Sequence, residues 1–282
     1  MEYITLNNGT KAPLAGIGTF LMSPADAEEA VYNALTNGYR LIDTANAYMN
    51  ERAVGRGMKR SGIAREEIYL STKLWPSVYA EADKAIDETL ARLDTDYIDL
   101  LFLHQPVGDY IGAYKAMERA VKAGKVKSLA LSNFPVEQIK EVIDACEIAP
   151  AFIQAETHPY FPQTELKAYL DTIGAHIMAW YPLGHGDKNL VNEPVFTELG
   201  KKYGKSNAQI ILRWHTQMGN VVIPGSTNPA HIKDNIDIFD FTLTEEELAR
   251  IAKVDKNKRY YEAKPEMLAG YLAFAPDFDE QP

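Results

Sequence analysis

The stretch Ile98-Asp99-Leu100-Leu101-Phe102-Leu103-His104 is an almost continuous apolar run that ends on a polar side chain. Such a run is typical of a parallel strand buried on both faces, where apolar and polar residues need not alternate. Seven further short runs rich in Ile, Leu and Val recur along the chain, at residues 15–19, 40–44, 68–74, 126–132, 152–157, 176–182 and 221–224. Helical patterns fill the segments between them, so the sequence predicts eight alternating strand and helix units.

No linker rich in Pro, Gly or Ser separates these units, which favours one domain over residues 1–282. We therefore predict an α/β fold, a closed (β/α)8 TIM barrel, with a β-hairpin ahead of it at residues 5–11, which contain an Asn-Gly turn. Ser23 and the pair Thr244 and Glu247 predict the starts of two helices. An open doubly wound sheet is the alternative, but the G-x-G-x-x-G turn that such sheets normally carry is absent.

The composition restricts the partners that we expect. The formal net charge is −10 and no basic stripe is present, so neither nucleic acid nor a membrane surface is an expected partner. Cys146 is the single cysteine and no Cys/His cluster has zinc spacing, which predicts a reducing compartment and no metal. Residues 1–10 lack the basic and apolar stretches of a signal peptide. We expect a cytoplasmic protein, and a monomer.

Polar or aromatic side chains follow the predicted strands directly, at the ends where barrels of this kind carry their chemistry. They are Asp43, Lys73, His104, Ser132, Asn133, Gln154 and Trp180. Taken singly, Asp43 could cap a helix and Lys73 could extend its amine into solvent. A lone His104 or Tyr48 is usually a packed residue. In a closed barrel, however, all of them face one rim, which predicts a single site.

The group Asp43, Tyr48, Lys73 and His104 suits carbonyl reduction. Hydride arriving at a carbonyl carbon develops negative charge on the oxygen, which needs a hydrogen-bond donor and then a proton. A tyrosine hydroxyl, with a pKa of about 10, can supply this proton when a nearby positive charge stabilises its phenolate. Lys73 can provide that charge, and Asp43 would hold the ammonium in place. His104 can donate a second hydrogen bond and orient the carbonyl.

The stretches that carry these residues resemble the aldo-keto reductase family. Residues 38–51 (GYRLIDTANAYMNE) resemble the family's first signature, residues 70–75 (LSTKLW) its lysine strand, and residues 101–106 (LFLHQP) its histidine strand. The similarity continues through residues 131–134, 154–159 and 179–184, and it covers nearly the whole chain with order and spacing kept. The short C-terminal segment and the Ala179-Trp180 pair are most similar to small members of the 2,5-diketogluconate reductase and methylglyoxal reductase type.

The resemblance implies an enzyme that reduces small aldehydes or ketones with NADPH or NADH. Tyr48 would be the general acid, Asp43 and Lys73 would support it, and His104 would align the substrate. Phe20 and Trp75 would contact the substrate, together with Tyr48 and His104.

The resemblance also implies the cofactor contacts. Ser132, Asn133 and Gln154 would hydrogen-bond the nicotinamide carboxamide, and Trp180 would stack on its ring. The other implied contacts are Gly18, Thr19, Asp43, Pro182, Leu183, Gly184, Ile223, Gly225, Ser226, Thr227, His231 and Asn235.

Two departures from the family pattern concern the cofactor. Tyr181 occupies a position where a serine is usual, and Gly225 and His231 occupy positions where the family normally has Lys and Arg. Those two cations hold the 2′-phosphate of NADPH. Glycine offers no side chain and histidine is mostly neutral at pH 7, so we expect relaxed cofactor specificity that leans toward NADH.

Two other functions remain open at the level of sequence. Some members of this family are nucleotide-sensing subunits of channels, which bind the cofactor without catalysis. A lysine at a barrel strand end can also form a Schiff base, so an aldolase that uses Lys73 is conceivable. An aldolase would leave Trp180, Asn133 and Gln154 unexplained.

Overall fold

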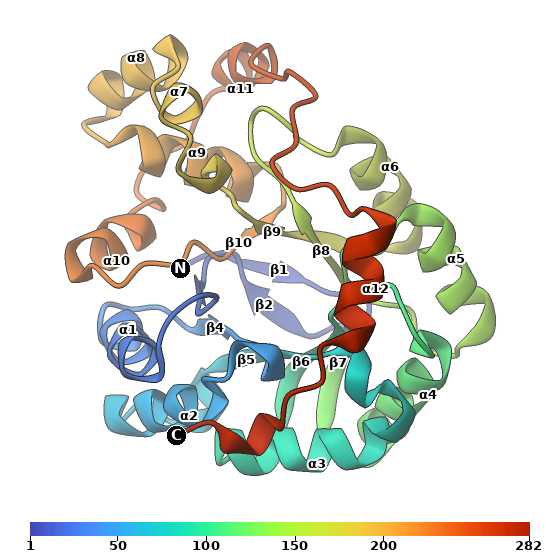
Figure 1. Ribbon diagram of the computed structural model, residues 1–282. Helices are drawn as coiled ribbons and strands as arrows, with labels where there is room; N and C mark the ends of the chain where they lie inside the picture. Colours follow the sequence, from blue (N-terminus) through green and yellow to red (C-terminus); the bar gives the residue numbers. More distant parts are fainter.

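An eight-stranded parallel sheet forms the centre of the computed structural model, which describes residues 1–282 (Figure 1). The strands pair in chain order, and this confirms the predicted (β/α)8 barrel. They are β3 (Ile17–Gly18), β4 (Leu41–Asp43), β5 (Tyr69–Leu74), β6 (Ile98–Leu103), β7 (Val126–Ser132), β8 (Phe152–Glu156), β9 (His176–Trp180) and β10 (Val221–Val222).

The barrel closes through a narrow seam between its first and last strands. β3 and β10 have two residues each, and one parallel bridge joins Ala15 to Val222. The backbone N–H of Gly16 donates to Val222 O at 2.8 Å, and the N–H of Val222 donates to Leu14 O at 3.0 Å. Both strands are shorter than predicted. After β10, Pro224 has no N–H to offer a ladder.

Helices surround the barrel on its outside (Figure 1). They are α1 (Pro24–Thr36), α2 (Glu51–Ser61), α3 (Ala82–Leu93), α4 (Tyr110–Lys122), α5 (Val136–Ala145), α6 (Thr164–Ile173), α7 (Lys188–Val191), α8 (Pro194–Tyr203), α9 (Asn207–Gln217), α10 (Pro229–Ile236) and α11 (Glu245–Ala252). A further helix, α12 (Pro265–Ala273), crosses one end of the barrel instead. The Ser23 side chain caps α1, and Thr244 with Glu247 forms a reciprocal capping box on α11, so both predicted helix starts are confirmed.

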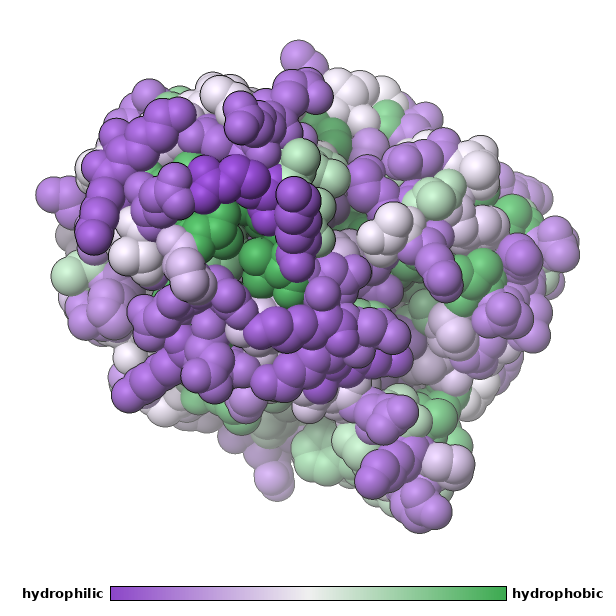
Figure 2. Space-filling model, turned by 90° about the horizontal axis from the view of Figure 1, so that it is seen from above, coloured by the Kyte–Doolittle hydropathy of each residue, from purple (hydrophilic) through white to green (hydrophobic).

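The outer faces of these helices are polar. Figure 2 shows one flank of the molecule, on which hydrophilic side chains cover most of the surface and apolar ones appear in small areas. This is expected where amphipathic helices turn their apolar stripe toward the sheet. No helix is both long enough and apolar enough to span a bilayer.

Large apolar side chains fill the barrel interior, and the predicted hairpin lies against them. Phe102 and Phe152 are fully buried inside, and such burial contributes about 1.5–3 kcal/mol for each side chain. Strands β1 (Tyr3–Thr5) and β2 (Lys11–Pro13) pair antiparallel, and the residues that directly follow them, Leu6 and Leu14, belong to the same cluster. The polar loops that can carry a site therefore lie at the opposite, carboxyl ends of the strands.

The C-terminal segment returns across the barrel, and its last residues attach to α2 and α3. Arg92 on α3 pairs with Glu51 on α2 at 2.7 Å, and both side chains are buried. Arg92 also donates to Asp279 at 3.0 Å, and the backbone N–H of Arg52 donates to Gln281. Helix α12, which we did not predict, precedes this attachment in the chain and lies in front of the barrel in the view of Figure 1.

Candidate active site

A cavity of about 700 Å³ opens at the carboxyl ends of the strands. Half of the 24 residues around it are hydrophobic, and Asp43 is the one Asp, Glu, Lys or Arg residue among them. This size and lining are usual for a small-molecule site. The residues come from loops after most of the strands and from the C-terminal segment, so the fold brings distant parts of the chain to one place.

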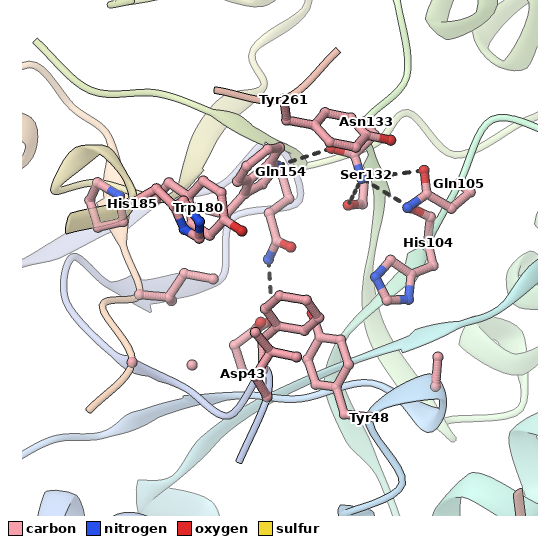
Figure 3. A pocket seen from close by; sticks show the side chains of 18 of the residues that line it. Asp43, Tyr48, His104, Gln105, Ser132, Asn133, Gln154, Trp180, His185 and Tyr261 are labelled. Carbon is pink, nitrogen blue, oxygen red and sulfur yellow. Dashed lines mark hydrogen bonds between the residues drawn. The ribbon is translucent and has the colours of Figure 1, made fainter. Parts of the chain in front are cut away.

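Asp43 and Lys73 form a buried ion pair beneath the cavity. The Lys73 ammonium donates to Asp43 Oδ2 at 2.6 Å and to Thr44 O at 2.8 Å. The other carboxylate oxygen, Oδ1, accepts from Ser71 Oγ at 2.7 Å and from Gln154 Nε2 at 3.2 Å (Figure 3). Burial lowers the pKa of Lys73, and the charge of Asp43 opposes this shift. Two neighbouring strands, β4 and β5, position this pair because Asp43 lies opposite Ser71 in their register.

Tyr48 lies over this ion pair at the end of a short 3-10 helix, Asn46–Tyr48. The ammonium nitrogen of Lys73 is 4.9 Å from the centroid of the tyrosine ring. Burial, and next the charge of Asp43, raise the pKa of Tyr48 well above its usual value. Lys73, which we expected to stabilise the phenolate, is paired with Asp43, and the net shift of the Tyr48 pKa is upward. The hydroxyl stays protonated at neutral pH.

His104 faces Tyr48 across the cavity (Figure 3). The two rings meet edge to face with centroids 5.6 Å apart, and Trp75 lies edge to face against His104 at 4.9 Å. Burial, and next the charge of Lys73, lower the pKa of His104 well below its usual value. The imidazole is therefore neutral, and it can donate one hydrogen bond without supplying the proton itself.

A network of amide groups forms another wall of the cavity. Asn133 Nδ2 donates to Ser132 Oγ at 3.2 Å, and Asn133 Oδ1 accepts from Trp180 Nε1 at 3.0 Å (Figure 3). Asn133 has a φ of 65°, a left-handed conformation that asparagine tolerates. Because the indole N–H is fixed by Asn133, the face of the Trp180 ring is held in one orientation.

The end of the cavity near the barrel seam is formed by close backbone contacts. A Cβ atom on Gly18 would lie 2.9 Å from Ile223 O, and one on Gly225 would lie 3.0 Å from Gly18 O. Any side chain at position 18 or 225 would therefore crowd the backbone at this end of the cavity. The bare backbone, together with the amides and the indole, fits a flat, polar nicotinamide and the phosphate groups attached to it.

Most of the predicted site residues line this cavity, and some do not. Asp43, Tyr48, Trp75, His104, Phe20 and the predicted nicotinamide contacts Ser132, Asn133, Gln154 and Trp180 line it, as do Gly18, Pro182, Leu183, Ile223 and Gly225. Lys73 is buried behind Tyr48, and Thr19 is buried behind Asp43, where its hydroxyl donates to Thr44. The predicted residues Gly184, Ser226, Thr227, His231 and Asn235 lie outside the lining.

No residue of the C-terminal segment was named in the predicted site, although this segment brings aromatic side chains to the cavity. Tyr261, Tyr271 and Phe274 line it, and Gln105 and His185 also do so. The signal available in the sequence was the density of aromatic residues after position 259, but no periodicity connects that tail to the barrel.

A parallel barrel with a protonated tyrosine, a buried Lys–Asp pair and a neutral histidine around one cavity defines a nicotinamide-dependent carbonyl oxidoreductase. The chain belongs to the aldo/keto reductase family, whose sequence model matches residues 14–256.

Relatives of known name support this membership. Morphine 6-dehydrogenase of Pseudomonas putida is 41% identical, with 91% of this chain and 92% of that protein covered. Methylglyoxal reductase DkgA of Salmonella typhimurium is 39% identical over 91% and 94% of the two chains. The crystal structure of a Bombyx mori aldo-keto reductase in complex with NADP matches with a TM-score of 0.87, 34% identity, and 93% and 95% coverage. The protein is an NAD(P)H-dependent oxidoreductase that acts on small carbonyl compounds.

Proposed function

We propose that Tyr48 donates the proton in carbonyl reduction while His104 orients the substrate and Lys73 with Asp43 supports Tyr48. The observation that carries this assignment is the placement of a buried ion pair directly beneath one tyrosine ring, with the Lys73 nitrogen 4.9 Å from its centroid. A Schiff-base aldolase would need an accessible amine. The Lys73 amine is instead fully buried and bound to Asp43 and Thr44.

The protonation states of Tyr48 and His104 determine their different roles in the reaction. A bound nicotinamide cofactor supplies the hydride that adds to the carbonyl carbon. Tyr48 is protonated at rest, so its hydroxyl can hydrogen-bond the carbonyl oxygen and transfer the proton as charge develops there. His104 is neutral and donates a second hydrogen bond to the same oxygen. When Tyr48 becomes a phenolate, the nearby Lys73 ammonium limits the energetic cost of that negative charge.

The nicotinamide end of the cofactor would be held by the amide wall. Ser132, Asn133 and Gln154 offer donors and acceptors for the carboxamide, and the fixed face of Trp180 would stack on the ring and select the side that faces the substrate. Gly18 would let the backbone approach closely. The contacts predicted beyond the lining, Ser226, Thr227, His231 and Asn235, would serve the adenosine end, since they follow β10 and lie at or in α10.

The test of Tyr48 is Tyr48→Phe, which keeps the ring and removes the acid. Turnover should fall by about 10²- to 10⁴-fold, the usual contribution of general acid catalysis, with cofactor affinity unchanged. Tyr110→Phe is the matched control, because its hydroxyl is on the exposed face of α4, bound to Glu141. Residual Tyr48→Phe activity within a few-fold of the parent would exclude this assignment. Turnover kinetics with cofactor binding measured by fluorescence quenching decide the question.

We also infer that the enzyme accepts NADH readily. The 2′-phosphate of NADPH requires fixed cations, and arginine grips phosphate through a planar fork of donors. Gly225 has no side chain to offer, and His231 is an exposed residue on α10. The absence of two charge-assisted hydrogen bonds at an open site should reduce the preference for NADPH by about ten- to a thousandfold.

His231→Arg tests this inference. It should move kcat/KM toward NADPH, while Gly225→Lys is the poorer design because its Cβ would crowd Gly18 O. His176→Arg is a control with the same substitution, at the far end of β9. A parent enzyme that prefers NADPH by several hundredfold, or an His231→Arg variant with unchanged preference, would contradict the inference.

A further inference from the structure

The carboxylate of Glu156 is buried beside the cavity and bound by three donors. Its side chain is 0% exposed at the end of β8. The backbone N–H groups of Tyr260 and Tyr261 donate to it at 2.6 and 3.1 Å, and His158 Nε2 donates at 3.0 Å. Two of these three donors belong to a segment more than one hundred residues later in the chain. Glu156 therefore fixes the backbone of the C-terminal segment at the point where it enters the site.

From this attachment, aromatic side chains continue around the substrate side of the cavity. Tyr261 lies edge to face with Trp180 at 5.5 Å, and its hydroxyl is 2.9 Å from the hydroxyl of Tyr271. Trp75 Nε1 donates to Tyr271 O at 2.9 Å, and the Trp75 and Tyr271 rings meet at 5.2 Å. Trp75 in turn contacts His104, so an unbroken series of contacts joins Glu156 to the histidine that orients the carbonyl.

Apolar side chains are exposed around the opening of the cavity. Phe20, which packs against Tyr48, is 50% exposed and Leu21 is 81% exposed, while Phe274 beside Trp75 is 46% exposed. No Lys or Arg lines the cavity, and the chain carries a net charge of −10. A carboxylated substrate would find no cation to bind, whereas a flat, neutral molecule could stack between these rings.

We propose that Glu156 is a specificity-determining positioning residue. Glu156 fixes Tyr261, and Tyr261 in turn holds Tyr271 against Trp75. These three aromatic side chains form a wall that selects flat, neutral aromatic aldehydes and ketones over small aliphatic or carboxylated ones. This inference rests on the proposed function, because the wall acts only on a carbonyl that reaches Tyr48. Glu156 itself does not touch the substrate.

Glu156→Gln tests the proposal, because it keeps the side-chain shape but replaces one acceptor oxygen by a donor that faces a backbone N–H. Glu193→Gln is the matched control. Glu193 also binds the C-terminal segment, accepting from Lys256 at 2.7 Å, but it lies outside the cavity. The substrates are 2-naphthaldehyde and propanal, together with the pair methyl 4-formylbenzoate and 4-formylbenzoate, which differ in charge.

The parent should favour 2-naphthaldehyde over propanal, and the neutral ester over the carboxylate, by about tenfold or more in kcat/KM. Glu156→Gln should raise KM for 2-naphthaldehyde by about three- to tenfold, the range expected for loosened aromatic contacts. Its kcat, its KM for propanal and its cofactor affinity should stay within about twofold of the parent values. Glu193→Gln should leave all these values within about twofold of the parent.

Equal losses on both aldehydes, no change in Glu156→Gln, or a parent that prefers the carboxylate would overturn the proposal. If Glu156→Gln does not fold, Tyr271→Ala must give the same split between the two aldehydes. A parent inactive on every carbonyl would instead overturn the proposed function itself.

Discussion

At the scale of single residues, the site depends on protonation states that burial imposes. His104 and Tyr48 share one buried space, and burial moves their pKa values in opposite directions, down for the imidazole and up for the phenol. Each group is thereby kept in its neutral form. His104 was predictable from the sequence because it follows an apolar run, and Tyr48 because the stretch around it resembles the family's first signature, but the direction of the Tyr48 shift was not predictable. It depends first on how deeply the fold buries the phenol and then on how close it brings Asp43.

These shifts predict the pH dependence of reduction. A proton donor loses activity when pH rises through its pKa, so a raised pKa moves the alkaline loss upward. A histidine that must stay neutral fails when pH falls through its pKa, so a lowered pKa moves the acidic loss downward. We therefore expect kcat/KM for NADH-dependent reduction to be constant from about pH 6 to about pH 9. This range extends below the ordinary histidine pKa of about 6.5 and stops short of the ordinary tyrosine pKa of about 10.

The pH profile of the parent enzyme, measured with a neutral aldehyde, checks this expectation. An acidic limb centred near pH 6.5 that disappears in His104→Gln would show that burial does not shift His104 as described, with pH 6.5 being about the reference value for histidine.

At the scale of elements, the ion pair between α2 and α3 is the strongest candidate for a stabilising contact between helices. Burial raises the pKa of Glu51, and the charge of Arg92 opposes this shift. Arg92→Met would leave the Glu51 carboxylate buried without its cation and would release Asp279. The free energy of unfolding should fall by about 3–5 kcal/mol, as for other broken buried pairs.

Arg119→Met is the control on the same outer layer. Arg119 pairs with Asp83 across α4 and α3, but both side chains are exposed, so the change should cost about 0.2–1 kcal/mol. Urea denaturation of the two variants distinguishes these costs. Equal effects would mean that the Glu51–Arg92 pair contributes no more than a surface pair.

Elements also differ in how well the sequence predicts them. The barrel strands and the capped helices were predictable because burial on both faces and capping leave local patterns, as in β6 and α11. Helix α12 was not, because none of its residues is buried and no apolar stripe marks it. Its position, and that of Tyr261, depend on contacts with Glu156 and Trp75 far away in the chain.

At the scale of the whole molecule, the two ends of the barrel have separate tasks. The hairpin end is packed with apolar side chains, while the carboxyl ends of the strands carry the polar groups of the site. The sequence predicted the site at the carboxyl ends of the strands, since apolar runs and the residues that end them are both local features, but it did not predict that the hairpin packs on the other end. It did not predict which wall of the cavity the C-terminal segment completes.

The seam between β3 and β10 has a consequence for the dynamics of the barrel. Few backbone hydrogen bonds hold it, those of Gly16 and Val222, so local opening should begin there. The proposed cofactor contacts Gly18 and Gly225 lie on its two sides. A bound dinucleotide would therefore join the first and last strands and complete the ring. Deuterium exchange at the amides of Gly16 and Val222 should slow when NADH is added, while the amides of β6 exchange slowly with or without it. Unchanged exchange at the seam would mean that the barrel is closed equally well without its cofactor.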